Sequence, residues 1–193
     1  HVTRVVDHAA WRDAFVSEIK RMGQETSGRV LRSVFFGGGT PSLMDPATVG
    51  AILDVVQTVW PTANDLEVTL EANPTSVEAS KFADFHLAGV NRVSMGIQAL
   101  NDPDSKEALA AFEIARKQFD RVSFDLMYGR QNQSLSNWES ELSTALALGL
   151  DHISLYQLTV ESGTAFGERY KAGKLRGLPD EDLSADFYAL TQD

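Results

Sequence analysis

The stretch Ser33–Pro41, with the sequence SVFFGGGTP, joins a short apolar run to three consecutive glycines, and a helical pattern follows at Pro46–Val59. Val and Phe favour β-strands, so Ser33–Phe36 is predicted as a strand. Asp45 precedes Pro46, which is typical of a helix that begins with an acidic N-cap and a proline in its first turn. The stretch therefore predicts one βα unit: a strand, a turn at its carboxyl end and a helix.

The same unit recurs along the chain. Further apolar runs lie at Leu66–Glu71, Asn91–Gly96, Arg121–Leu126 and His152–Tyr156. Helical patterns lie at Ala9–Met22, Val77–Ala88, Lys106–Phe119, Leu135–Leu148 and Pro179–Gln192. Successive runs begin 33, 25, 30 and 31 residues apart, a spacing typical of parallel strands joined by helical crossovers. The pattern predicts an α/β fold, either an incomplete parallel (β/α) barrel or a doubly wound sheet.

Composition excludes several classes of protein. The chain has 193 residues, 17 Lys and Arg against 27 Asp and Glu, a net charge of −10 and a hydrophobic content of 43%. Such a chain can bury a core, and we predict one domain over residues 1–193. The negative charge argues against nucleic-acid binding, and no apolar run approaches the roughly 18 residues of a membrane helix. The chain has no cysteine, which excludes thiolate metal sites within it, and a cytoplasmic location is expected.

Polar groups or bare backbone follow every predicted strand. The first strand leads into Gly37, Gly38, Gly39 and Thr40, the second ends at Glu71, and Gln98, Asp125 and Thr159 belong to the last three. In parallel β/α folds, the chemistry gathers at the carboxyl ends of the strands. We therefore predict that these residues line one ligand site.

Each of these residues also has a structural interpretation. The three glycines fit a sharp turn as well as a backbone cradle for a small ligand, and they match neither phosphate-binding glycine motif. Glu71 suits a helix cap or an ion pair, although a carboxylate at a strand end favours the hydroxyl groups of a ribose. For Asp125 and Gln98, structural and ligand-binding roles remain equally open.

Other segments carry little chemical signal. No pair of the four histidines has metal-ligand spacing, and no nucleophile elbow is present. The sequence therefore predicts no metal ligands and assigns no catalytic residue. We interpret Gly163–Phe166 and the basic residues after it as a polar loop and helix on the solvated surface, and residues 101–105 as an ordinary loop.

Five strings together resemble one known family. They are FFGGGTPSLM (35–44), LEANP (70–74), NRVSMGIQ (91–98), FDLMYG (124–129) and ISLYQLTVESGTAF (153–166). They resemble the radical S-adenosylmethionine (SAM) proteins related to oxygen-independent coproporphyrinogen III oxidase, over nearly the whole chain. Within that family, Glu71–Pro74 is similar to the haem-chaperone, or HemW-type, branch, whereas the oxidase tends to carry an acidic-Pro-Arg sequence there.

The resemblance implies a partial (β/α) barrel of the radical SAM type and two cofactors, a [4Fe–4S] cluster and SAM. By the same resemblance, Gly37–Thr40 lies against the methionine end of SAM, and Glu71 binds its ribose. Gln98, Asp125 and Thr159 match other residues that line the cofactor or the adjacent site. Haem or a porphyrinogen is the implied partner, together with a haem-acceptor protein.

The chain departs from the family pattern in three places. It lacks the C-x-x-x-C-x-x-C loop that holds the cluster, so no residue here can ligate one. A family segment with a Gly-Arg-x-His-like string is absent where Asp104 meets Ser105, and the family's C-terminal domain would follow Asp193. We expect these segments to be disordered parts of a longer protein; a truncated chain is the alternative.

Three functions follow as hypotheses. The first is a haem chaperone, which the Glu71–Pro74 string favours. The second is oxidative decarboxylation of coproporphyrinogen III to protoporphyrinogen IX. The third is a β/α domain that binds another small nucleotide. The sequence leaves the oligomeric state open.

Overall fold

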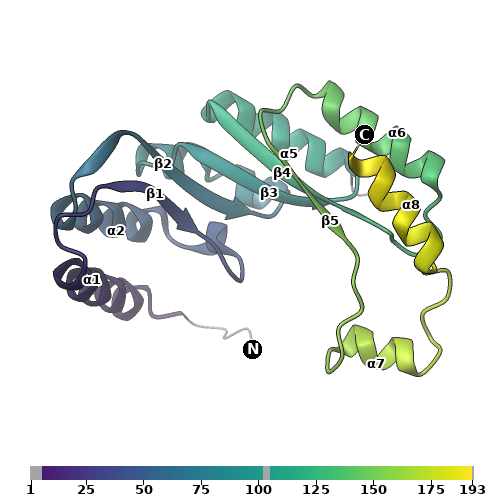
Figure 1. The fold of residues 1–193 in the computed structure, drawn as a ribbon. Helices are drawn as coiled ribbons and strands as arrows, with labels where there is room; N and C mark the ends of the chain where they lie inside the picture. The colour runs from purple at the N-terminus through teal and green to yellow at the C-terminus, as the bar shows by residue number, and fades with distance from the viewer. Residues whose placement is uncertain (1–5, 102–104, 193) are drawn as a thin grey trace. The chain divides into compact units, whose positions relative to one another are not determined.

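The structure is a computed structural model that describes residues 6–101 and 105–192. It forms two compact units, His1–Gly96 with Lys106–Val122 and Ile97–Ser105 with Ser123–Asp193. The strands are β1 (Leu31–Phe36), β2 (Thr62–Ala72), β3 (Arg92–Gln98), β4 (Arg121–Tyr128) and β5 (Ile153–Gln157) (Figure 1). The helices are α1 (His8–Glu25), η1 (Pro41–Leu43), α2 (Pro46–Val59), α3 (Ser76–Ala79), α4 (Phe82–Leu87), α5 (Ser105–Gln118), α6 (Leu135–Ala147), α7 (Ala165–Lys171) and α8 (Glu181–Gln192).

The sheet decides between the two predicted architectures. Its strands follow the order β1-β2-β3-β4-β5, and the β1–β2, β2–β3 and β4–β5 pairs are parallel. A doubly wound sheet requires a point at which the strand order reverses. The sequential order contains no such point, so the sheet has the topology of an incomplete (β/α) barrel.

The core of the first unit lies between the sheet and its helices. Leu70 of β2 and Val93 of β3 are fully buried, as are Val49 of α2 and Phe82 of α4. Phe82 meets Phe119 edge to face, with the ring centroids 5.9 Å apart, a favoured aromatic geometry. Leu70 also pairs with Phe36 of β1, near the carboxyl ends of the two strands, where the predicted glycine turn and Glu71 lie.

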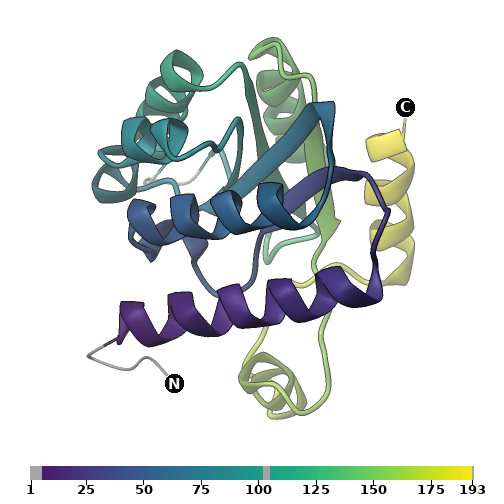
Figure 2. The same ribbon diagram turned by 90° about the vertical axis from the view of Figure 1, so that its left-hand side faces the viewer.

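Helix α1 lies alongside α2 on the outside of the first unit (Figure 2). No residue of α1 is buried, and Trp11 is 59% exposed. A β-carbon at Gly23 would overlap the side chain of Val59 on α2, so this glycine lets the two helices approach closely.

The second unit is built around three aromatic side chains. Tyr128 at the end of β4 stacks on Trp138 of α6 with ring centroids 5.3 Å apart, and Phe187 of α8 lies 6.3 Å from Tyr128. Trp138 is fully buried, and its indole N–H donates to Thr191 Oγ1 at 2.9 Å. Burial raises the pKa of the Tyr128 phenol, with Tyr188 adding to the shift. The ring cluster therefore joins α6 and α8 to the end of β4.

The predicted elements agree with the structure apart from two segments. The predicted helix Val77–Ala88 is divided into α3 and α4, because Lys81 N–H donates to the Glu78 carbonyl in a turn. The segment interpreted as a loop and helix on the solvated surface does contain a helix, α7, but Phe166 is half-buried and Gly167 is buried. The predicted break between residues 104 and 105 falls partly outside the described residues, as does residue 1.

No helix within residues 6–101 and 105–192 is long and apolar enough to cross a bilayer.

We predict that Trp138→Ala lowers the free energy of unfolding by about 3–5 kcal/mol, because it removes a fully buried indole and its hydrogen bond. Denaturant unfolding measures the change. Trp11→Ala is the matched control, and because Trp11 is 59% exposed its cost should stay below about 1 kcal/mol. Equal costs for the two variants would contradict the packing described for α6.

Candidate functional site

The glycine turn after β1 adopts a backbone that other residues enter only with strain. Gly38 has a φ of 81° and Gly39 a φ of 46°, both in the left-handed region. A β-carbon on Gly37 would lie 2.7 Å from the Phe35 ring. Three consecutive glycines are therefore needed here, two for conformation and one for space.

Glu71 at the end of β2 is aimed at this turn. Its Oε2 accepts the Gly38 N–H at 3.0 Å. Its Oε1 would lie 3.4 Å from a β-carbon on Gly37 and accepts no hydrogen bond from the described residues. The structure thus brings two of the predicted site residues, Gly38 and Glu71, into contact, and one carboxylate oxygen remains available to a ligand.

A second, buried carboxylate holds the chain around this pair. Glu78 on α3 is 5% exposed and accepts hydrogen bonds from the Ser42 hydroxyl, from Asn73 N–H at 2.8 Å and from the Asn73 side-chain amide at 3.2 Å. The same Asn73 amide lies 3.4 Å from Thr40 Oγ1. A buried carboxylate without a cation is tolerated because several donors surround it. Glu78 therefore ties the segment after β1 to the segment after β2.

The turn borders a cavity of about 290 Å³ in the first unit. Its lining is Phe15, Phe35, Phe36, Gly37, Gly38, Thr40, Pro41 and Met44. Gly37, Gly38 and Gly39 are exposed, and their carbonyls accept no backbone hydrogen bond from the described residues. Three open carbonyls suit an ammonium group, which has three donors and no acceptor.

The second unit contains the other three predicted residues, Gln98, Asp125 and Thr159. Asp125 is half-buried on β4, opposite Ser154 of β5, and Thr159 is exposed just beyond β5. All three lie at or beyond the carboxyl halves of their strands. Their membership of one site with the glycine turn remains a prediction.

Gln98 ends β3 in a strained conformation. Its φ is 65°, and the Ala99 N–H donates to the Ile97 carbonyl across it at 2.8 Å, which makes the rarer, strained form of γ-turn. Glu141 on α6 is 3% exposed and accepts the Leu100 N–H at 2.6 Å, which anchors the chain two residues after Gln98. Strain of this kind persists only where neighbouring contacts impose it, and it is common at functional sites.

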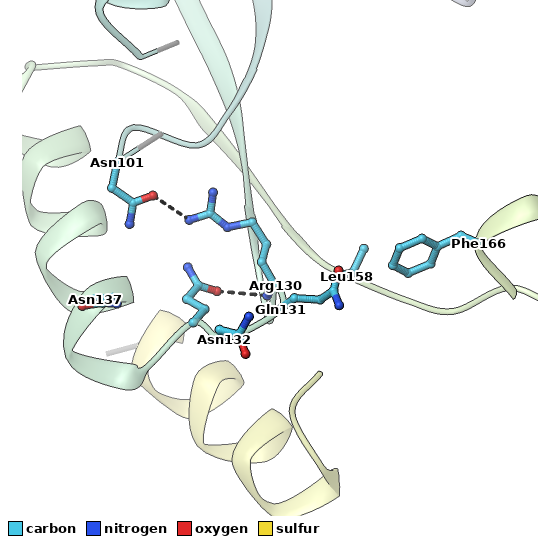
Figure 3. Close-up of a pocket in the computed structure, with 8 residues that line it drawn as sticks. Asn101, Arg130, Gln131, Asn132, Asn137, Leu158 and Phe166 are labelled. Atoms are coloured by element: carbon cyan, nitrogen blue, oxygen red, sulfur yellow. Dashed lines mark hydrogen bonds between the residues drawn. The ribbon is translucent and has the colours of Figure 1, made fainter. Parts of the chain in front are cut away.

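A larger cavity, of about 480 Å³, lies in the second unit (Figure 3). Its lining is Asn101, Arg130, Gln131, Asn132, Gln133, Asn137, Leu158 and Phe166. Sequence reasoning missed this cavity, because it treated 101–105 and 163–166 as surface loops. The one available signal was Arg130-Gln131-Asn132-Gln133, a polar run directly after a strand exit.

The residues present fit one of the two implied cofactors. For SAM, the first unit offers open glycine carbonyls to the amino group and the free Glu71 oxygen to a ribose hydroxyl. For a [4Fe–4S] cluster, the chain offers no cysteine, and the described residues contain no cluster of three His, Asp or Glu side chains that could hold a metal. The cluster therefore does not fit the residues present.

Replacing Glu78 tests whether it holds the site together. We expect Glu78→Ala to cost about 1–3 kcal/mol in the free energy of unfolding, because the Ser42 and Asn73 donors lose their buried acceptor. Glu113→Ala, an exposed carboxylate on α5 of the same unit, is the control and should change stability by less than about 0.5 kcal/mol. Denaturant unfolding compares them, and indistinguishable variants would remove Glu78 from this role.

Known proteins resemble the chain in sequence and in fold. The sequence profile of the radical SAM superfamily matches residues 10–144. Radical S-adenosyl methionine domain-containing protein 1, mitochondrial, of Bos taurus is 41% identical over 97% of this chain and 45% of its own length. Heme chaperone HemW of Escherichia coli is 39% identical over 83% of this chain and 44% of its own length. The chain thus spans about half the length of the curated relatives it matches.

A solved structure shares the fold. Coproporphyrinogen III oxidase (HemN) of Escherichia coli, described as a radical SAM enzyme, superposes with a TM-score of 0.79 over 99% of this chain and 46% of its own, at 24% identity. This confirms the predicted fold class, an α/β chain whose five parallel strands form part of a (β/α) barrel.

Proposed function

Because the chain belongs to the radical SAM superfamily, we propose that it binds SAM at the glycine turn and serves haem metabolism as a haem chaperone of the HemW type. The observation that carries the cofactor assignment is the contact between Glu71 and Gly38, which leaves Glu71 Oε1 open to a ligand. The observation that carries the chaperone assignment is the similarity to Heme chaperone HemW, at 39% identity over 83% of the chain.

The residues of the first unit bind and orient the cofactor. Gly37, Gly38 and Gly39 present backbone carbonyls to the ammonium group, and a β-carbon at Gly38 or Gly39 would meet no atom within 4 Å. Glu71 accepts a ribose hydroxyl through Oε1, while Oε2 keeps the turn in place through Gly38. SAM would supply one-electron chemistry in this site, and these 193 residues contain no thiolate that could hold the [4Fe–4S] cluster.

The remaining assignments complete the proposal. Gln98, Asp125 and Thr159 line the cofactor or the adjacent site, as the family resemblance implies. Haem is the cargo, and a haem-acceptor protein is the partner. The cytoplasmic location remains a prediction, because relatives named as mitochondrial match the chain as well.

We expect Glu71→Ala to weaken SAM binding by about 1–3 kcal/mol, the scale of a lost hydrogen bond to a charged group. Glu71→Gln keeps the side-chain size and separates the effect of charge from that of volume. Equilibrium dialysis against labelled SAM measures the affinity, with Glu113→Ala as the control. Unchanged affinity would remove Glu71 from the site. Failure of the unaltered protein to bind SAM would favour a domain for another nucleotide.

A direct comparison of activities tests the chaperone assignment. The purified protein is assayed anaerobically for haem transfer to a haem-free acceptor and for decarboxylation of coproporphyrinogen III. A protein that carries cysteines outside these 193 residues is assayed after its [4Fe–4S] cluster has been reconstituted. We expect stoichiometric haem binding and transfer, without protoporphyrinogen formation. Sustained decarboxylation would overturn the chaperone assignment in favour of the oxidase.

A further inference from the structure

We propose that the cavity of the second unit binds a carboxylate-bearing aromatic ring system, with Arg130 at the carboxylate and Phe166 against the ring. A porphyrin propionate is the ligand of this class that the proposed function supplies, so the identity of the ligand rests on that function. The juxtaposition behind the proposal is a guanidinium and side-chain amides at one part of the cavity, with Leu158 and Phe166 at another (Figure 3).

The size of the cavity fits part of a large ligand. Its volume is about 480 Å³, within the usual range for small-molecule sites. The lining comes from four regions: Asn101 after β3, the segment after β4, α6 at Asn137, and the segment from the end of β5 to α7. A cavity of this size would hold one edge of a flat ring system, and the rest of the ligand would extend beyond it.

Arg130 is fixed in place and still has donors to offer. Its Nη2 donates to Asn101 Oδ1 at 3.1 Å and to Glu141 Oε2, and Gln133 Oε1 accepts its backbone N–H at 3.1 Å. Its Nε and Nη1 meet no acceptor among the described residues. Because two partners hold the guanidinium, the Arg130 side chain is already ordered, and it loses little conformational entropy when a ligand binds.

Glu141 sets the charge that the cavity accepts. Its side chain is fully buried, and it accepts hydrogen bonds from Leu100 N–H and Gln133 Nε2 as well as from Arg130. Arg130 and Glu141 together carry no net charge, so the cavity lacks the excess positive charge that a phosphate dianion would need. A carboxylate needs only hydrogen-bond donors, which Arg130 Nη1 and the Asn137 amide provide.

Phe166 and Leu158 provide the apolar side of the cavity. Phe166 is half-buried at the start of α7, and Leu158 follows β5, with its N–H bonded to the Tyr128 carbonyl at 2.9 Å. Thr164 caps α7 by accepting Gly167 N–H at 3.0 Å, which fixes the helix turn that carries Phe166. An aromatic side chain and a guanidinium that line one cavity offer a planar ring with an acidic substituent an apolar contact and hydrogen-bond donors.

The test compares two ligands that differ only at the carboxylates, protoporphyrin IX and its dimethyl ester, titrated into the purified protein in the same dilute detergent. We expect Arg130→Lys and Asn137→Leu each to weaken binding of the free acid about tenfold, the scale of a hydrogen bond to a charged group, and to leave the ester unchanged. Arg130→Lys keeps a positive charge beside Glu141, and Asn137 is exposed, so both variants should fold.

Phe166→Ala should weaken binding of both ligands equally. Arg169→Gln, an exposed arginine on α7 outside the cavity, is the control and should change neither affinity. If the unaltered protein binds the free acid and the cavity variants match it, the inference is overturned while the proposed function stands. If the unaltered protein binds neither porphyrin nor haem, the proposed function fails and the inference fails with it.

Discussion

Two carboxylates hold the glycine turn after β1, and the candidate cofactor site depends on them. Glu71 accepts the Gly38 N–H, and the buried Glu78 accepts hydrogen bonds from Ser42, which follows the turn, and from Asn73, which follows β2. Glycines in the left-handed region are flexible on their own. The carboxylates restrain the turn and the segments next to it before any ligand binds.

The second unit also contains a buried glutamate that accepts hydrogen bonds from loops, Glu141. Glu141 is buried on α6 and accepts hydrogen bonds from the segment after β3, at Leu100, and from the segment after β4, at Arg130 and Gln133. In each unit a helix thus supplies a buried acceptor that fixes loops at the ends of neighbouring strands. Breaking such a network is costly, because the donors stay buried.

The proposed binding groups are all present in this chain, whereas cluster ligands are not. We propose roles for the described residues in binding an amino group, a ribose hydroxyl and a carboxylate, and the chain has no cysteine to hold a cluster. The chain belongs to the radical SAM superfamily and is similar to haem chaperones. Loops that are fixed in advance lose less entropy when a ligand binds, so a preorganised surface favours binding.

The sequence alone determined the strand and helix order, the α/β class, the glycine turn and the family, because periodicity and turn chemistry are local. Asp45, for example, caps α2 as predicted, and α2 has the predicted bounds. The tertiary structure decided what depends on distant partners. It showed that Glu71 contacts Gly38 across 33 residues, that Glu78 is a buried acceptor and that α7 contributes Phe166 to a cavity with Arg130. Hydrogen bonds between residues far apart in the chain leave no periodic trace in the sequence, so only the folded chain reveals them.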